Sequence, residues 1–192
     1  PRSQKENTLY FPQFGAIAAD GTIYALGPLD RLYQVAPDGR TVASHPVPGY
    51  DNLTGADVAI DSKGAVYVTV VTSDLGPQQP GQSWIGKLAP DGTLSPFAGG
   101  PGNPTGFSDG PSHTARFDHP SALAFDAFDN LYVADRGNLS IRRITTEGMV
   151  ATVAGWGRPQ FPPSPMPGQP SPDLAPFVEG TLPVVTLTVT RA

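Results

Sequence analysis

Cysteine is absent from the 192 residues, which excludes disulfide bonds and cysteine metal sites. Sustained helical periodicity is scarce, and no apolar run approaches the roughly 20 residues that a transmembrane helix needs. Positive charge is in deficit, because 12 Lys and Arg stand against 17 Asp and Glu for a net charge of −5. Since nucleic-acid-binding surfaces are normally basic, this balance argues against nucleic acid as a partner.

Familiar catalytic signatures are missing as well. The chain contains no G-x-S-x-G sequence, no phosphate-binding loop, and no H-x-H or H-E-x-x-H spacing for a zinc site. Its three histidines are His45, His113 and His119. We expect His119, directly before Pro120, to pack at the start of a strand, whereas His113 lies in a long loop and is a candidate ligand contact. These absences make an enzyme the less favoured hypothesis.

Proline and glycine are abundant, at 23 and 22 residues, which fits many short strands and turns. The clearest pattern lies between Phe117 and Gly155, where four short apolar runs are separated by turns. The first run ends at Asp126, and the others are Leu131–Ala134, Ile141–Ile144 and Met149–Ala154. Four such strands in sequence predict one antiparallel sheet of the kind that forms a β-propeller blade.

The same pattern occurs twice upstream, over residues 14–49 and 53–100. Asp-Gly or Glu-Gly turns recur before the last strand of each unit, where glycine supplies the positive φ of a tight turn. These turns are Asp38-Gly39, Asp91-Gly92 and Glu147-Gly148. Three units in phase predict an all-β fold of three four-stranded antiparallel blades over residues 14–155.

The third unit resembles the NHL repeat, with Asp135 and Asn138 in a D-x-x-N motif that is followed by Ile141-Arg142-Arg143. The long connection Gly99–Pro120 is also similar to a form found in bacterial NHL proteins, through residues that include Asp109, Arg116 and Phe117. The resemblance implies a ring that usually has six blades. It also implies that Asp135 and Asn138 satisfy turn backbone, and that one of the two arginines pairs with a carboxylate between blades. In the connection it implies that Arg116 and Asp109 hold the loop and that Phe117 packs between blades.

Three blades are too few for a closed propeller, which typically has 4–8. Each open side would expose an apolar blade face, and such faces attract partners. Three alternatives remain: missing blades on a longer polypeptide, a homodimer of two half-rings, or a fold that departs from a propeller. Because the chain starts at Pro1 without Met, we expect a processed chain or a fragment.

The ends of the chain differ from the repeats. Residues 1–13 precede the first blade, and residues 156–180 form a Pro-rich segment that predicts an extended linker. Within residues 181–192, valine and leucine alternate with threonine, which predicts a C-terminal strand that starts a next domain or pairs with a blade edge. This organisation favours an exported multidomain protein that is secreted, periplasmic or at the cell surface.

The long loops gather on one face of the predicted propeller, the usual binding face of a repeat array. The candidate contacts on this face are Arg136, His113, Arg116, Asp109, Gln78, Gln79 and Trp84. Three acidic residues, Asp20, Asp61 and Asp126, are predicted to end the first strand of each unit on the opposite, short-turn side. Together they could bind Ca²⁺ at the channel, although we expect each mainly to cap its own hairpin.

The favoured functional hypothesis is a non-enzymatic recognition or scaffold propeller that binds a protein or a glycan on the long-loop face. The first alternative is a propeller-type lyase or lactonase with a central-channel metal, which needs converging His, Asp, Glu or Asn side chains. The second alternative is a structural assembly subunit that uses edge strands. Because fold does not determine function, the choice depends on the site.

Overall fold

The computed structural model describes residues 14–27, 31–47, 57–72, 81–100 and 102–155. This part of the chain is all-β, with one three-residue 3₁₀ helix, and its strands form three antiparallel sheets. The prediction of three four-stranded blades is therefore confirmed. The predicted N-terminal segment, Pro-rich linker and C-terminal strand lie outside the described residues.

Each sheet contains a meander of four consecutive strands, and we call the sheets blades one, two and three in chain order. Blade one contains β1 (Phe14–Ile17), β2 (Ile23–Gly27), β3 (Arg31–Val35) and β4 (Thr41–Pro46). Blade two contains β5 (Val58–Ile60), β6 (Val66–Val71), β7 (Ser83–Leu88) and β8 (Leu94–Ala98). Blade three contains β10 (Pro120–Phe125), β11 (Leu131–Asp135), β12 (Ser140–Ile144) and β13 (Met149–Gly155).

Two short elements in and beside blade three were not predicted from the sequence. Strand β9 (Gly110–Pro111) comes from the long connection and pairs with β13, so blade three has a fifth strand. The 3₁₀ helix η1 (Arg136–Asn138) forms the loop between β11 and β12. Both elements are too short to leave a periodic apolar pattern, which explains why periodicity did not reveal them.

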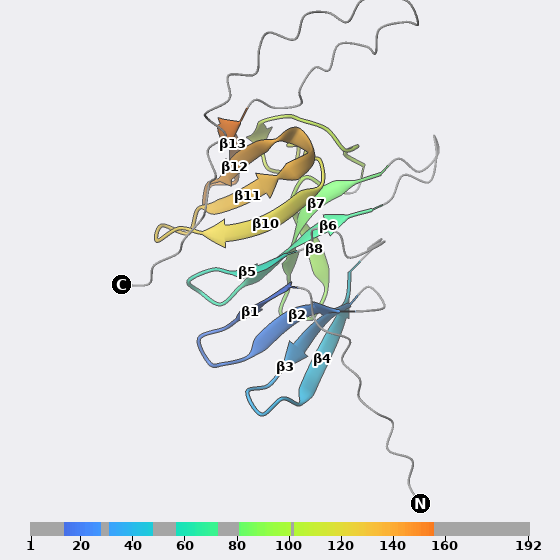
Figure 1. The fold of residues 1–192 in the computed structure, drawn as a ribbon, viewed down its shortest axis with the longest axis vertical. Helices are drawn as coiled ribbons and strands as arrows, with labels where there is room; N and C mark the ends of the chain where they lie inside the picture. The colour runs from blue at the N-terminus through green and yellow to red at the C-terminus, as the bar shows by residue number, and fades with distance from the viewer. Residues whose placement is uncertain (1–13, 28–30, 48–56, 73–80, 101, 156–192) are drawn as a thin grey trace, which may run out of the picture.

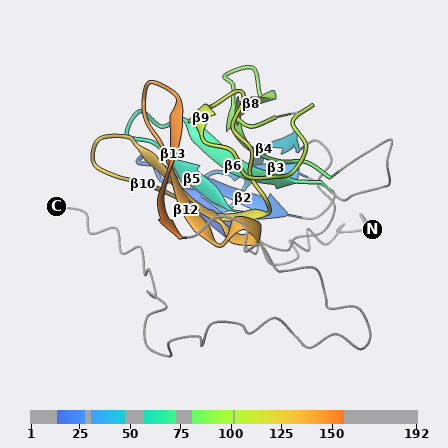
Figure 2. The ribbon, with the colours of Figure 1, turned by 90° about the horizontal axis from the view of Figure 1, so that it is seen from above.

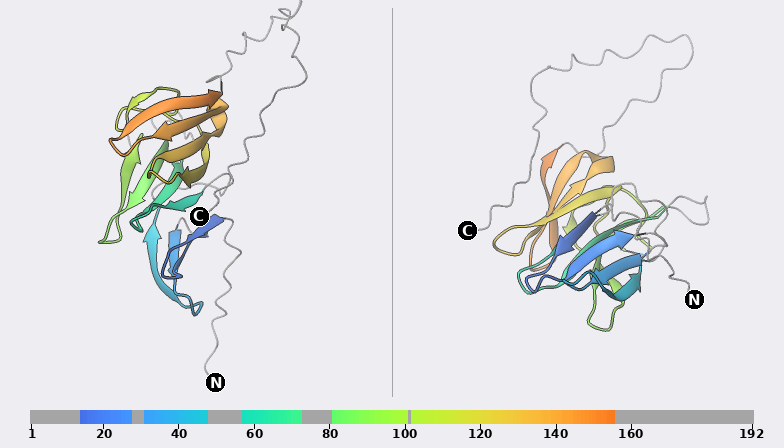
Figure 3. Two further views of the ribbon diagram at one scale, coloured as in Figure 1. Left: turned by 90° about the vertical axis from the view of Figure 1, so that its left-hand side faces the viewer. Right: turned by 60° about the horizontal axis from the view of Figure 1, so that its bottom comes forward.

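The three blades follow one another in space in chain order (Figures 1 and 3). Seen from above, the sheets lie one behind another (Figure 2). The first strands are neighbours, since β1 contacts β5 and β5 contacts β10. Because the strands run antiparallel within each blade, the loops between second and third strands share one end with the connections between blades. We call this the long-loop end and the opposite end the short-turn end.

Buried side chains form two clusters, one at each junction between blades. The first cluster joins Leu26 and Leu32 of blade one to Val58, Val68 and other residues of blade two. The second joins blade two to blade three and has the following buried members: Ala59, Tyr67, Ile85, Ala98, Ala115, Phe117, Leu123, Leu131, Val133, Ile144 and Val150. Phe117 is fully buried in it, as the sequence predicts. The core of this protein therefore lies between sheets rather than within one of them.

Candidate functional site

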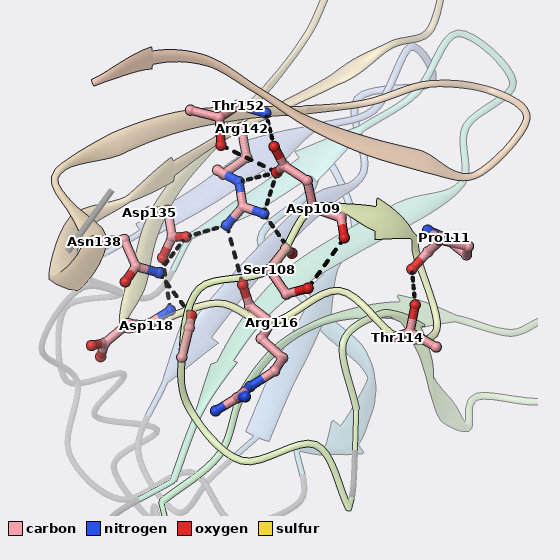
Figure 4. A network of polar contacts seen from close by, with 11 residues as sticks. Ser108, Asp109, Pro111, Thr114, Arg116, Asp118, Asp135, Asn138, Arg142 and Thr152 are labelled. Carbon is pink, nitrogen blue, oxygen red and sulfur yellow. Dashed lines mark hydrogen bonds and ion pairs between the residues drawn. The ribbon is translucent and has the colours of Figure 1, made fainter. Parts of the chain in front are cut away.

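The long-loop end of blade three is built around the side chain of Arg142, on β12. This guanidinium is fully buried, and it donates hydrogen bonds to two carboxylates and two backbone carbonyls (Figure 4). The carboxylates are those of Asp135, at 2.8 Å from Nη1, and Asp109, at 3.0 Å from Nε. The carbonyls belong to Ser108 and Arg116, at 2.7 and 3.1 Å. An arginine can be buried in this way because nearly all its donors are satisfied.

Two aromatic rings complete the environment of Arg142. The ring centroid of Phe107 lies 4.7 Å from the guanidinium carbon, and that of Phe117 lies 5.2 Å away. These distances fit cation–π contacts, which favour arginine over lysine because its planar head stacks on a ring. Phe107, Ser108, Asp109, Arg116 and Phe117 all belong to the long connection. One buried side chain of β12 therefore holds the connection on blade three.

Asp109 links Arg142 to the outer strand of the blade. Its carboxylate accepts hydrogen bonds from the backbone N–H of Thr152, at 2.9 Å, and from the Thr152 hydroxyl, at 3.1 Å. Burial alone would raise the pKa of Asp109, but the hydrogen bonds from Thr152 and Arg142 outweigh it and lower the pKa. Asp109 is consequently a charged anchor for the connection, in agreement with its expected role.

Asp135 and Asn138 form the inner part of the same network. Asp135 accepts from the backbone N–H of Asp118, at 2.7 Å, and from Asn138 Nδ2, at 2.8 Å. Asn138 Nδ2 also donates to the carbonyl of Gly106, at 2.8 Å. Burial raises the pKa of Asp135, and the hydrogen bonds and the nearby charge of Arg142 offset this only in part. The pair satisfies backbone of the connection rather than that of its own turn, which corrects the expectation.

Arg116 fastens a different part of the connection. Its Nε donates to the carbonyl of Pro104 and its Nη2 donates to that of Thr105, both at 3.1 Å. Its backbone pairs with that of Ser108, so residues 104–116 form a closed loop. This confirms that Arg116 holds the loop, although its partners are carbonyls rather than a carboxylate.

Several accessible side chains surround this network. Phe107 is 40% exposed and Leu139 is 60% exposed, while Arg136 is exposed at the start of η1. His119 is exposed as well, with its ring Nδ1 at 2.5 Å from Asp118 Oδ1. The segments that carry them are linked, because the Asn138 side chain donates to the carbonyl of Gly106 and the N–H of Gly137 donates to the carbonyl of Asp118. The result is a mixed apolar and polar surface on a fixed backbone.

Phe107, Leu139 and His119 were not predicted as surface residues of the site. The expectation that His119 packs at the strand entry is wrong, because its φ of 50° turns the side chain outward before Pro120. Leu139 also has a positive φ, of 49°, at the end of η1. Such left-handed backbone is uncommon for residues other than glycine, and no sequence pattern marked these two positions.

The remaining predicted contacts lie elsewhere. His113 is exposed but belongs to the outer side of the connection, where the neighbouring Ser112 bonds Gly99 and Gly148. Trp84 is only 2% exposed and packs in the cluster between blades one and two, so its ring is not available at the surface. Gln78 and Gln79 lie outside the described residues. The structure thus brings Arg136, Arg116 and Asp109 to one end, whereas Trp84 is buried between blades one and two and His113 lies on the outer side of the connection.

The acidic residues at the short-turn end cap hairpins. Asp61 accepts from the N–H groups of Lys63 and Ala65, and Asp126 accepts from those of Phe128 and Asn130, at 2.8–3.0 Å. Each of these two residues directly follows the first strand of its blade. Within the described ranges, no three His, Cys, Asp or Glu side chains lie close enough together to hold a metal ion. Binding of Ca²⁺ stays a prediction.

Asp20 is not equivalent to Asp61 and Asp126, which corrects the prediction that each of the three ends the first strand of its unit. The backbone bonds that close the first hairpin start at Ala18, as they start at Asp61 and Asp126 in the other blades. Asp20 lies two residues further on and accepts the N–H of Thr22, at 2.9 Å. The proposed set of three matching carboxylates therefore does not exist.

Comparison with known proteins supports the fold and goes no further. Neither the family models nor the curated proteins contain a match to this chain. Among solved structures, the chain is similar to a protein of unknown function from Bacteroides thetaiotaomicron, with 19% identity and a TM-score of 0.61. It is also similar to two auxiliary nutrient binding proteins, from Bacteroides thetaiotaomicron and Bacteroides ovatus, with 20% and 18% identity and TM-scores of 0.56 and 0.55.

The alignments cover most of this chain but only part of each solved chain. They cover 76%, 74% and 74% of this chain but only 36%, 35% and 36% of the three solved chains. The chain thus spans about a third of the length of these structures. No helix in the described ranges is long and apolar enough to cross a membrane.

Proposed function

We propose that the long-loop end of blade three is a recognition surface for a protein or a glycan, in a non-enzymatic module of an exported multidomain protein. The surface consists of Phe107, His119, Arg136 and Leu139. It combines apolar side chains with a cation and a histidine, the mixture typical of binding surfaces. The observation that carries the proposal is the burial of Arg142, which fixes the long connection beneath this surface.

A fixed connection matters because a flexible loop loses conformational freedom when it binds. Here the carbonyls of Ser108 and Arg116 and the carboxylate of Asp109 are held by one guanidinium before any partner arrives. Asn138 holds Gly106 in the same way. The backbone that carries Phe107 is therefore ordered in advance, which favours binding over a purely structural role for so long a connection.

The exported setting is part of the proposal and depends on the Pro-rich sequence of residues 156–180 and on the alternation of valine and leucine with threonine in residues 181–192. The similar solved structures include two auxiliary nutrient binding proteins. At 20% and 18% identity these show the fold alone. The choice between a protein and a glycan as the partner is left to the experiment.

The test uses the full chain against a printed glycan array and a displayed peptide library. Two variants alter the surface: Arg136→Glu reverses its charge, and Leu139→Asn removes its most exposed apolar side chain. Asn tolerates left-handed backbone better than Leu, so the second change does not strain the fold. The matched controls, Lys63→Glu and Phe128→Asn, alter exposed residues at the short-turn end.

We expect one library to give specific ligands whose binding falls at least tenfold in both surface variants and stays unchanged in both controls. Melting temperatures should be the same for all five proteins. Absence of specific ligands in both libraries would overturn the proposal. Equal losses in surface and control variants would show that binding occurs elsewhere.

A further inference from the structure

The two junctions between blades are built in the same way. In each, a face that carries a tyrosine on its second strand packs on an apolar face of the next blade. Tyr24 of blade one belongs to the cluster that contains Ile60 of blade two. Tyr67 of blade two lies edge to face with Phe125 of blade three, with ring centroids 5.1 Å apart.

Polar contacts add to each junction. Between blades two and three, the carboxylate of Asp57 accepts the N–H of Leu123, at 2.8 Å, and Ser62 donates to Asp129. Between blades one and two, the ring Nδ1 of His45 lies 3.0 Å from the carbonyl of Gly92. In both junctions, the tyrosine face of one blade therefore packs on the blade that follows it in the chain. We call the tyrosine face the forward face of a blade.

Blade three ends in a tyrosine face that no other blade covers in the described part of the chain. Tyr132 pairs across the sheet with Ala124 and Arg143, as Tyr67 pairs with Ala59 and Lys87. These residues alternate with the side chains that pack on blade two, so they point to the opposite side. Nε of Arg143 is buried there without a hydrogen-bond partner. This is the forward face of the last blade.

Blade one begins with an apolar face, around Ile17 and Ile23, on which no other blade packs in the described part of the chain. Ile17 pairs with Ile23, as Ile60 pairs with Val66 and Phe125 with Leu131. Ile17 is thus the counterpart of Phe125, the residue that meets the tyrosine of the preceding blade. It is 67% exposed. Its counterparts Ile60 and Phe125 are partly buried in the two internal junctions.

We propose that the tyrosine face of blade three docks on the apolar face around Ile17 of blade one in a second copy of this chain. Tyr132 of one copy then meets Ile17 of the other, and the same contact forms again on the opposite side. Two copies with three blades each make a closed ring within the usual range of blade number. The twofold axis of this ring runs along its central channel. The inference does not depend on the proposed recognition surface.

A second copy is favoured over other occupants because both halves of the junction are present on one chain. The two faces differ from each other, yet each matches a face that already packs against the other kind inside the protein. A head-to-tail interface of this kind closes when the rotation returns to its start, and it leaves no unpaired face. A dissimilar partner would need to match only one of the two faces and would leave the other exposed.

Native mass spectrometry and analytical ultracentrifugation of the full chain test the proposal. We expect a mass of two copies at micromolar concentration, and a monomer for Ile17→Asp, which places a charge in the junction. Phe128→Asp is the matched control, since Phe128 is exposed on a turn of blade three and should leave the dimer intact. Circular dichroism of the Ile17→Asp monomer checks that it remains folded.

A mixing experiment tests the polarity of the junction. Ala124→Asp damages the forward face of blade three, so this variant should also be monomeric. A mixture of the two monomeric variants should form a heterodimer, because one of its two junctions combines two unaltered faces. A symmetric junction between identical faces predicts no such rescue.

A full chain that stays monomeric at all concentrations would overturn the proposal. That result would assign the faces to the chain's own residues 181–192 or to a different protein. A dimer that survives both substitutions, or an assembly larger than two copies, would overturn it as well.

Discussion

At the residue scale, the main feature of this protein is that two adjacent arginines make different contacts. Arg142 and Arg143 point to opposite faces of β12, and only Arg142 meets carboxylates. The sequence predicted that one of the pair would be bound to a carboxylate but could not say which. The answer depends on which face of blade three meets blade two, and that is a property of packing between sheets.

Replacement of Arg142 by Leu should lower the free energy of unfolding by about 3–5 kcal/mol, because the fully buried Asp135 loses its charge partner. Chemical denaturation measures this change. Arg40→Leu is the control, since its ion pair with Asp38 is exposed and 3.9 Å long, and it should change stability by at most about 1 kcal/mol. Equal effects of the two substitutions would contradict the role given to Arg142.

Asp57 should make the stability of the protein depend on pH. Burial raises the pKa of Asp57, and the hydrogen bonds from Leu123 and Val58 offset this only in part. The folded state then binds a proton more readily than the unfolded state. The contribution of Asp57 is fully present below its unfolded pKa and is lost as the pH rises through its folded pKa.

The wild type should therefore gain stability relative to Asp57→Asn as the pH falls from about 7 to about 4. Relative to Asp129→Asn, the wild type should instead lose stability as the pH falls below about 4, because hydrogen bonds from Ser62 lower the pKa of Asp129. Its stabilising contribution is present above the unfolded pKa and lost as the pH falls through the folded pKa. Urea denaturation at several pH values distinguishes the two slopes, and parallel curves would contradict the assignment.

The candidate site was predictable where a local motif determines it. The sequence indicated that Asp109 and Arg116 hold the connection, and both do so. It did not indicate that Trp84 is buried or that His119 and Leu139 face outward. These outcomes depend on positive φ angles and on contacts between blades, and neither leaves a signal in a single sequence.

At the element scale, hairpins determine the register of the blades. The strands and their order were predictable from apolar alternation and Asp-Gly turns, and Gly39, Gly92 and Gly148 all have the positive φ that such turns need. The prediction for Asp20 was wrong because an aspartate near the end of a first strand need not occupy the same position of the hairpin. The backbone hydrogen bonds place Ala18, not Asp20, at the position that Asp61 and Asp126 occupy in the other blades.

The two kinds of hairpin carboxylate should differ in their contribution to stability. Asp126 accepts two backbone N–H groups and Asn130 Nδ2, all at 2.9 Å, whereas Asp20 accepts a single N–H. Asp126→Ala should therefore lower the free energy of unfolding by about 1–2 kcal/mol. Asp20→Ala should have a clearly smaller effect, and thermal denaturation of both variants provides the comparison. A larger effect at Asp20 would contradict the corrected register.

At the scale of the whole molecule, the sheets depend on one another because the core lies at their junctions. Phe117 comes from a connection rather than from a strand, yet it is fully buried between blades two and three. Phe117→Ala should lower the free energy of unfolding by about 3–5 kcal/mol through the cavity that it leaves. Phe128→Ala, at an 81% exposed position, should change little. Differential scanning calorimetry measures both, and an unchanged transition in Phe117→Ala would contradict the packing role.

The number of blades in the ring was the least predictable feature. Repeats in phase indicate how many blades a chain supplies, but closure depends on faces that meet only after folding. Tyr132 and Ile17 are ordinary strand residues in the sequence. Their significance becomes visible only when the packing of Tyr24 and Tyr67 is compared with theirs.

The pairing of β9 with β13 has a consequence for how such a protein can change during evolution. Blade three and the connection that leads to it should be inherited together, because Asp109 and β9 are bound to Arg142, Thr152 and Met149. A gene duplication with its boundary at residues 99–103 would copy blade three together with the connection that is bound to it. A boundary at residues 112–119 would separate the two and leave the buried Arg142 without Asp109, one of its two carboxylate partners, in the copy. Viable lineages of this protein should therefore gain or lose blades at the first position and not at the second.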